Sequence, residues 1–158
     1  MIPTIVIFDC DNVIADDGWR IPMIKRTDNV WNRYHNYHLA SAYDNVGNRH
    51  LLHGAAHRSI YIFTAMPEHY RHLRELWFNH RRIPYTKLVM RPDNDHRPSV
   101  ELKRSMLLDL FDRGFSPAHI AAAYDDRPDV VAMYRKYDVN ASVVRIHSLS
   151  YAQPHKEQ

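Results

Sequence analysis

Short apolar runs alternate with amphipathic stretches along most of the chain, and this alternation restricts the fold more than any other feature of the sequence. The stretches between the runs place apolar residues at helical spacing: Pro67–His80, Ser99–Phe111 and Pro128–Tyr137. The runs have the length of buried strands, and most are rich in β-branched residues: Thr4–Phe8, Ser59–Phe63, Thr86–Met90, Ile120–Tyr124 and Ser142–Ile146. This order predicts an α/β fold, with a five-stranded parallel sheet covered by helices on both faces.

The segment from Asp16 to Arg58 interrupts the alternation. It is polar and aromatic, shows no clear strand, and is longer than a simple connection between a strand and a helix. We expect two helices in it, around Asp28–His38 and Asp44–His57, and we interpret residues 16–58 as a small helical insertion after the first strand. Because 158 residues suit one domain, we expect a single domain over residues 1–158.

Composition limits the class of protein. No apolar run approaches the ~20 residues that a membrane-spanning helix needs, and the start MIPTIVIF lacks the features of a secretory signal. The single cysteine, Cys10, excludes an internal disulfide and fits a reducing compartment. We therefore expect a cytoplasmic protein without a membrane partner. The net charge of +3 suits a phosphate-bearing partner but is too small to indicate a nucleic-acid groove.

Polar side chains follow the ends of three predicted strands. Asp9 and Asp11 come directly after the first strand, Thr64 after the second, and Asp125 with Asp126 after the fourth. Ligands of an open α/β sheet bind beyond the carboxyl ends of its strands, so we expect these side chains to gather at one edge.

Lys103 belongs to the same group of residues. It lies three and four positions before Met106 and Leu107, on the apolar face of the helix that follows the third strand. From this position we expect its ammonium group to reach a carboxylate or a phosphate at the edge of the sheet.

Such a set of side chains suits the hydrolysis of a phosphate monoester. Carboxylates bind a hard cation such as Mg²⁺, which neutralises a phosphate. Asp9 can then attack phosphorus to form an aspartyl phosphate, while Asp11 gives a proton to the leaving oxygen and later takes one from water. Thr64 and Lys103 would hold the phosphoryl oxygens. The candidate metal ligands are Asp9, Asp11, Asp125 and Asp126.

Each of these residues also fits a purely structural role. Aspartates after strands often form turns, and Thr64 fits the N-cap of the helix expected from Pro67. The stem of Lys103 can pack along apolar neighbours while its charge reaches solvent. Asp126 can serve the positive end of the following helix. Cys10 is expected to pack beneath the loop.

In their order and spacing these motifs resemble those of the haloacid dehalogenase (HAD) superfamily of phosphatases. The sequence DCDNV at residues 9–13 matches the first motif, Asp-x-Asp-x-Thr/Val. Thr64 matches the second motif, Lys103 the third, and the pair Asp125 and Asp126 the fourth. The resemblance covers residues 4–147. It implies a HAD-like Rossmannoid three-layer fold and a magnesium-dependent phosphatase.

Within that superfamily the chain resembles the 3′-phosphatase domain of bacteriophage polynucleotide kinase and its stand-alone relatives. The stretches LVMRPDNDHRPSVELKRSML and DDRPDVVAMYRKYDV carry this likeness, which implies a phage source and a host cytoplasm. Arg20, nine residues after Asp11, falls where that group has an arginine for the substrate phosphate. Two positions depart from the pattern: Met66 replaces the arginine of the second motif, and Ser99 replaces an acidic residue four positions before the lysine.

These departures bear on the substrate. With Met66 in place of the arginine, Arg20 and Lys103 are the cations expected at the phosphate. We expect a nucleotide (5′- or 3′-monophosphate) or a terminal phosphate of nucleic acid, with a mononucleotide hydrolysed more efficiently than a 3′-phosphorylated oligonucleotide. The alternatives are a phosphatase for a sugar phosphate or another small metabolite, and a binding or assembly protein that keeps the fold without turnover.

An aromatic and histidine cluster falls on one face of the first helix expected in the insertion: Trp31, Tyr34, His35 and His38. Packing of the insertion onto the domain explains this face. If it instead overhangs the strand ends, Trp31, Tyr34 and His35 would contact the base or sugar of a nucleotide. Both interpretations stay open.

Overall fold

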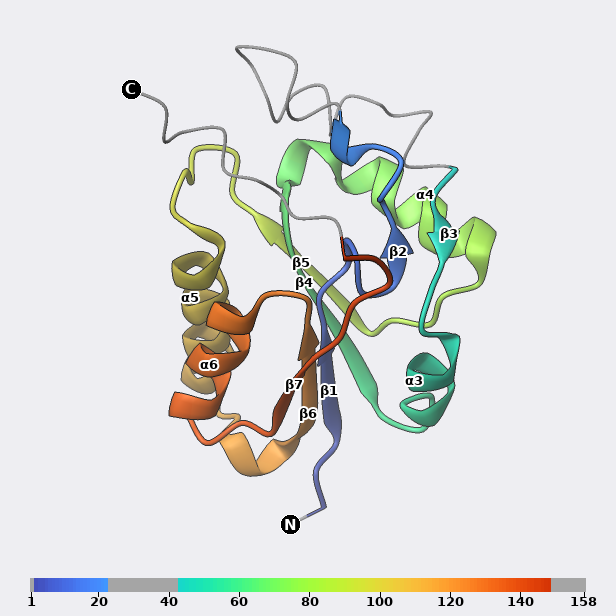
Figure 1. Ribbon diagram of the computed structural model, residues 1–158. Helices are drawn as coiled ribbons and strands as arrows, with labels where there is room; N and C mark the ends of the chain where they lie inside the picture. The colour runs from blue at the N-terminus through green and yellow to red at the C-terminus, as the bar shows by residue number, and fades with distance from the viewer. Residues whose placement is uncertain (1, 23–42, 149–158) are drawn as a thin grey trace.

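The computed structural model describes residues 2–22 and 43–148. Within them, parallel strands form one sheet in the order β5-β4-β1-β6-β7 (Figure 1). The bounds are β1 Ile5–Phe8, β4 Ser59–Pro67, β5 Lys87–Arg91, β6 Ile120–Asp125 and β7 Ala141–Val143. The predicted five-stranded parallel sheet is confirmed, and each strand overlaps the apolar run that predicted it.

Helices cover both faces of this sheet and give three layers (Figure 1). Helices α5 (Ser99–Asp112) and α6 (Pro128–Lys136) lie on one face, and α3 (Arg49–Gly54) and α4 (Arg71–Arg81) lie on the other. Two short 3₁₀ helices, η2 (Glu68–Tyr70) and η3 (Pro117–His119), precede α4 and β6. In the described ranges no helix is long and apolar enough to cross a membrane.

The central strand β1 divides the apolar core between the two faces. Val6 and Phe8 pack in the cluster that contains Trp77 and Phe78 of α4, while Ile5 and Ile7 pack in the cluster formed with α5 and α6. Because β1 is buried on both faces, a charge is disfavoured along its whole length. Asp9 is the first residue after β1, and its side chain is still buried, so its charge needs partners.

The order of the strands also explains where a ligand site can form. From β1 the chain places β4 and β5 to one side and β6 and β7 to the other. Beyond the carboxyl ends of β1 and β6 the connections diverge in opposite directions, which is the usual position of ligand sites in open α/β sheets. The residues at the carboxyl ends of β1 and β6, Asp9, Asp125 and Asp126, lie at this position.

The α4 region differs from the expectation in two respects. Pro67 is the last residue of β4, so the helical segment begins with Glu68 and not with the proline. The buried residues of α4 include Arg74 and Trp77, whereas Leu76 is 49% exposed. The helical spacing of Leu73, Leu76, Trp77 and His80 thus predicted the inward face in part: Trp77 is buried and Leu73 packs against the core, but Leu76 is exposed and Arg74 is buried.

The described part of the insertion contains short strands that the sequence did not indicate. β2 (Ala15–Asp16) pairs antiparallel with β3 (Asn45–Val46). The expected helix over Asp44–His57 is wrong at its start, because residues 45–46 are extended and α3 covers Arg49–Gly54 alone. Asn48, in the left-handed region, donates its Nδ2–H to the carbonyl of Val13 at 2.7 Å and ties this turn to the loop after β1. The helix expected around Asp28–His38 lies outside the described residues.

Candidate active site

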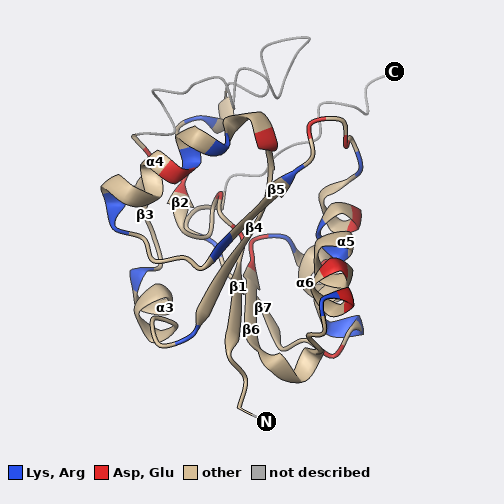
Figure 2. Ribbon diagram, turned by 180° about the vertical axis from the view of Figure 1, so that it is seen from behind, with Lys and Arg blue, Asp and Glu red and all other residues tan. Residues whose placement is uncertain are grey.

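Three buried carboxylates meet at the carboxyl ends of β1 and β6. Asp9 follows β1, Asp125 ends β6 and Asp126 comes next, and one oxygen from each lies within 4.8 Å of the others. The sheet places them together because Asp9 donates its backbone N–H to the carbonyl of Tyr124 at 2.8 Å. In Figure 2 the ribbon turns red at the end of β6, between the layers of helices. The predicted gathering of Asp9 with the acidic pair is observed.

The ammonium group of Lys103 lies among these carboxylates. Its Nζ is 2.8 Å from Asp9 Oδ1 and 2.6 Å from Asp125 Oδ2, and its side chain is 2% exposed. Burial by itself lowers the pKa of a lysine, but the charges of Asp125 and Asp9 outweigh that effect and raise the pKa of Lys103. Lys103 is therefore a buried cation, and the alternative in which its charge reaches solvent does not apply.

The cluster contains more carboxylates than Lys103 can balance. Burial raises the pKa of Asp9 well above its usual value, Lys103 opposes this, and the charges of Asp125 and Asp126 add to the rise. Burial and the charge of Asp125 also raise the pKa of Asp126. Buried carboxylates are costly without compensating positive charge. Three converging carboxylate oxygens with a deficit of positive charge fit a hard divalent cation.

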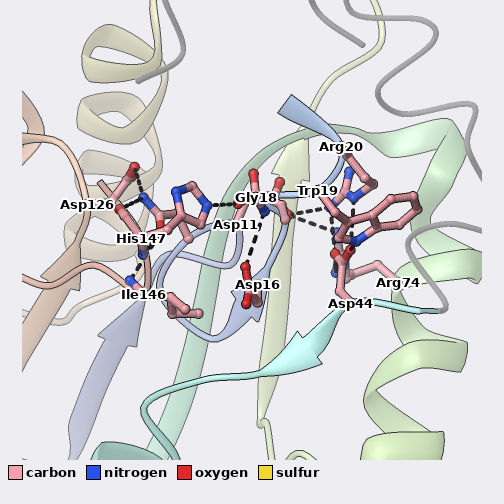
Figure 3. Close-up of polar contacts among 12 residues, drawn as sticks. Asp11, Asp16, Gly18, Trp19, Arg20, Asp44, Arg74, Asp126, Ile146 and His147 are labelled. Atoms are coloured by element: carbon pink, nitrogen blue, oxygen red, sulfur yellow. Dashed lines mark hydrogen bonds and ion pairs between the residues drawn. The ribbon is translucent and has the colours of Figure 1, made fainter. Parts of the chain in front are cut away.

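Asp11 lies in a different environment from Asp9. Its Oδ1 accepts hydrogen bonds from Arg20 Nη2 at 3.2 Å and from Arg74 Nη2 at 3.0 Å (Figure 3). Both arginine side chains are fully buried. The three-carboxylate cluster does not include the side chain of Asp11, so the predicted role of Asp11 as a metal ligand stays a prediction. The side chain of Asp11 forms ion pairs with the guanidinium groups of Arg20 and Arg74.

Asp44, which like Arg20 belongs to the insertion, is a second carboxylate beside this pair of arginines. Arg20 donates from Nε to Asp44 Oδ1 at 2.9 Å and from Nη2 to Oδ2 at 2.6 Å, and Trp19 donates from Nε1 to Oδ1 at 2.9 Å. Burial raises the pKa of Asp44, and the hydrogen bonds and charge of Arg20 oppose that rise. Arg20, which by resemblance is a substrate-phosphate arginine, thus contacts Asp11 on one side and Asp44 on the other.

Arg74 and Asp44 are the residues of this site that sequence reasoning missed. The helix that contains Arg74 was interpreted from its apolar residues, and Asp44 was assigned to the start of a helix. One signal was present: Arg74 precedes Trp77 by three positions, so the two share a face of α4.

Thr64 lies within β4, close to the same edge of the sheet. Phe8 pairs with Ile62, so Thr64 stands two residues beyond the last pair of β1 with β4. It is buried, and its Oγ1 accepts the backbone N–H of Met66 at 3.1 Å. Thr64 is not a helix cap, because Pro67 occupies the N-cap of η2. Met66 is buried in the apolar core and offers no positive charge to the site.

Asn12 fixes the loop that follows β1. Its φ of 62° is in the left-handed region, which asparagine tolerates better than most residues. Its Oδ1 accepts the backbone N–H groups of Ile146 at 3.1 Å and His147 at 2.9 Å, and its Nδ2 donates to Asp126 Oδ2 at 3.3 Å. Cys10 is buried beneath this loop, as expected, and burial raises the pKa of its thiol. The loop is therefore tied to both Asp126 and the segment after β7.

The predicted substrate-contact residues of the insertion, Trp31, Tyr34 and His35, lie outside the described residues together with His38. Whether they contact a substrate stays a prediction. Two other aromatic side chains are exposed beside the site, Trp19 at 44% and Tyr43 at 69%. With Asp16 and Asn45 they line a hollow of about 430 Å³.

Known proteins share the sequence pattern and the fold. Residues 3–147 match the family model of the polynucleotide kinase PNKP phosphatase domain. None of the curated proteins matches the chain. Among solved structures, a chain of the Pnkp1/Rnl/Hen1 RNA repair complex superposes with a TM-score of 0.71 and 21% identity, over 94% of this chain and 44% of that one. This chain thus spans less than half of that relative.

Two hydrolase structures show the same fold over most of their own length. A haloacid dehalogenase-like family hydrolase from Streptococcus pneumoniae superposes with a TM-score of 0.63 and 11% identity, over 88% of this chain and 83% of that one. CbbY from Rhodobacter sphaeroides, in complex with phosphate, gives 0.60 and 14%, over 99% and 90%. At these identities the solved structures establish the fold alone. The family is shown by the match of residues 3–147 to the family model.

Proposed function

The chain belongs to the polynucleotide kinase PNKP phosphatase-domain family of HAD phosphatases, and from that premise we propose that it hydrolyses a phosphate monoester with Mg²⁺, using Asp9 as the nucleophile. The observation that carries this proposal is the placement of Lys103 between Asp9 and Asp125 in a buried cluster of carboxylates. A buried cation beside the carboxylate that follows the central strand suits a site that receives a phosphoryl group.

The proposed metal ligands are Asp9, Asp125 and Asp126. Their converging oxygens and the excess of negative charge in the cluster support this assignment. When bound, Mg²⁺ supplies the positive charge that lets an anionic phosphate approach three carboxylates. Lys103 remains in place to orient Asp9 and to contact the transferring oxygens.

In the proposed first step, a carboxylate oxygen of Asp9 attacks phosphorus. An O–P bond to Asp9 forms, the bond from phosphorus to the ester oxygen breaks, and Asp11 gives its proton to that oxygen so that an alcohol leaves. In the second step Asp11 takes a proton from water, the water oxygen attacks phosphorus, and the bond to Asp9 breaks. Inorganic phosphate leaves, and Asp9 and Asp11 return to their starting states.

The proposed substrate is a nucleotide or a terminal phosphate of nucleic acid. The family description supports it, and so does the hollow in which the exposed rings of Trp19 and Tyr43 offer stacking surfaces. Trp19 and Arg20 both donate to Asp44, and Arg20 also donates to Asp11, so we assign the leaving group to the side of Asp11 that these contacts connect to the hollow. Trp31 stays proposed as a further contact to the base, and Arg20 to the phosphate.

Phosphate release by the purified protein tests the proposal. With Mg²⁺, we expect turnover of 3′- or 5′-mononucleotides, less efficient turnover of 3′-phosphorylated oligonucleotides, and little of sugar phosphates. Asp9→Asn is the control, since an amide removes the nucleophile at constant shape. A preference for sugar phosphates would show that the proposed substrate class is wrong. If no phosphate were released from any phosphate monoester, the proposed activity would be overturned.

A further inference from the structure

A buried guanidinium group on α4 has no part in the steps above. Arg74 is fully buried, and within the part of the chain that the structure describes its Nε and Nη1 make no hydrogen bond. Nη1 lies 3.8 Å from Asp44 Oδ2, beyond hydrogen-bond distance. Buried donors without partners destabilise a fold, and an apolar residue of similar size is often more stable at such a position. The arginine therefore indicates a constraint other than stability.

Arg74 does form a hydrogen bond to the loop that follows β1. Its Nη2 donates to Asp11 Oδ1 at 3.0 Å, and Arg20 Nη2 donates to the same oxygen at 3.2 Å from a different segment (Figure 3). Two donors that converge on one oxygen restrict the direction in which the carboxyl group faces. The Asp11 side chain is still 15% exposed, so a substrate can approach it.

The core holds Arg74 in this position. Trp77, one helical turn further along α4, is fully packed, and the guanidinium carbon of Arg74 lies 5.2 Å from the centre of its ring. Trp77 also donates Nε1–H to the carbonyl of Asp44 at 2.9 Å. The donor to Asp11 is thus fixed by a helix that packs on the sheet.

We propose that Arg74 is a positioning residue for Asp11. It keeps Oδ1 turned toward α4, so that the other oxygen delivers the proton to the leaving group. This inference rests on the proposed function, in which Asp11 is the proton donor. As the O–H bond of Asp11 breaks and the proton joins the leaving oxygen, the guanidinium stabilises the carboxylate that forms. No bond to Arg74 itself is made or broken.

Substrates whose leaving groups differ in their need for a proton can distinguish a positioning role of Arg74 from a role in phosphate binding or in packing. A nucleoside alkoxide needs a proton to leave, whereas 2,4-dinitrophenolate does not. A positioned general acid contributes about 10²–10⁴-fold. Arg74→Met is therefore expected to lower the rate at which the leaving group is released in the first turnover at least about tenfold for a nucleoside monophosphate and less than about twofold for dinitrophenyl phosphate. The second step, in which Asp11 takes a proton from water, is the same for both substrates, so it is the first turnover that is compared. Arg74→Lys keeps the charge in a different geometry, and we expect a smaller loss with the same selectivity.

Arg71 gives the matched control. It lies on the same helix, three positions before Arg74, and forms ion pairs with Glu68 and Glu75 at the surface. Arg71→Met is expected to leave the ratio of the two activities unchanged. Thermal unfolding of each variant reports damage to the fold, and added guanidinium ion is expected to restore nucleotide turnover to Arg74→Ala, which a lost packing contact would not allow.

Each of the other outcomes has a definite meaning. Equal losses on both substrates with a raised KM would make Arg74 a phosphate ligand, and unchanged nucleotide turnover in Arg74→Met would exclude any role; either result overturns the proposal. If Arg74→Met fails to fold, the selectivity of Arg74→Lys decides. Failure of the wild-type protein to hydrolyse either substrate would instead overturn the proposed function.

Discussion

Replacing Lys103 with methionine tests whether the buried lysine compensates the carboxylate cluster. Methionine keeps most of the apolar stem and removes the charge that lies 2.8 Å from Asp9 and 2.6 Å from Asp125. Removing one partner of a buried ion pair costs about 3–5 kcal/mol, because the remaining charges stay buried and unpaired. For a domain of this size, 1 kcal/mol corresponds to about 2–4 °C, so Tm should fall by roughly 6–20 °C.

Urea and thermal unfolding in buffer with a chelator measure this loss. Lys136→Met is the matched control, because Lys136 is exposed at the end of α6. Mg²⁺ should then raise Tm more in Lys103→Met than in the wild-type protein, since the variant cluster has a larger deficit of positive charge. A loss below about 1 kcal/mol, no larger than that of Lys136→Met, would refute the reasoning.

Trp19→Ala should raise KM for a nucleoside monophosphate about 5–150-fold, since stacking on a base is worth ~1–3 kcal/mol, and should leave KM for p-nitrophenyl phosphate almost unchanged; Trp19→Phe separates stacking from the bond to Asp44, and equal losses on both substrates would exclude a base contact. Asp11→Asn should slow turnover of a nucleotide more than that of dinitrophenyl phosphate and keep Mg²⁺ binding in calorimetry; loss of Mg²⁺ binding would return Asp11 to the metal ligands. The hydrogen bonds of Arg97 lower the pKa of Asp95 to about 2, below its ordinary value of 3.8. A lowered pKa stabilises the fold above the ordinary value, and this contribution is lost as pH falls through the folded-state value. Asp95→Asn should therefore be less stable than wild type at pH 7, and the difference should shrink steadily as pH falls from about 4 through 2; parallel stability curves over this range would contradict the assignment.

The sheet and the acidic end of the site were predictable because both depend on local sequence. β1 is buried on both faces, so its residues form a continuous apolar run, and Asp9 marks the end of that run. Asp125 likewise ends β6, where it follows the apolar run Ile120–Tyr124. Since parallel strands present their carboxyl ends at one edge, two local signals were enough to place Asp9 and Asp125 together.

The arginine side of the site depends on contacts between distant segments. Arg74 is 63 positions from Asp11, and arginine is among the residues least often buried, so its inward position could not be predicted from α4 alone. Helical spacing assigned both Trp77 and Leu76 to the inward face, and only Trp77 is buried there. The two-residue strands β2 and β3 are too short to show an alternating pattern.

Detection of a phosphoryl group on Asp9 during turnover tests the central claim most directly. The protein is mixed with Mg²⁺ and a nucleoside monophosphate, quenched in acid within the first turnover, and digested for mass spectrometry. We predict a phosphoryl adduct on the peptide that contains Asp9, at the carboxylate of that residue, and neither adduct nor phosphate release in Asp9→Asn. Release of phosphate by the wild-type protein without modification of Asp9, or turnover by Asp9→Asn, would contradict the account.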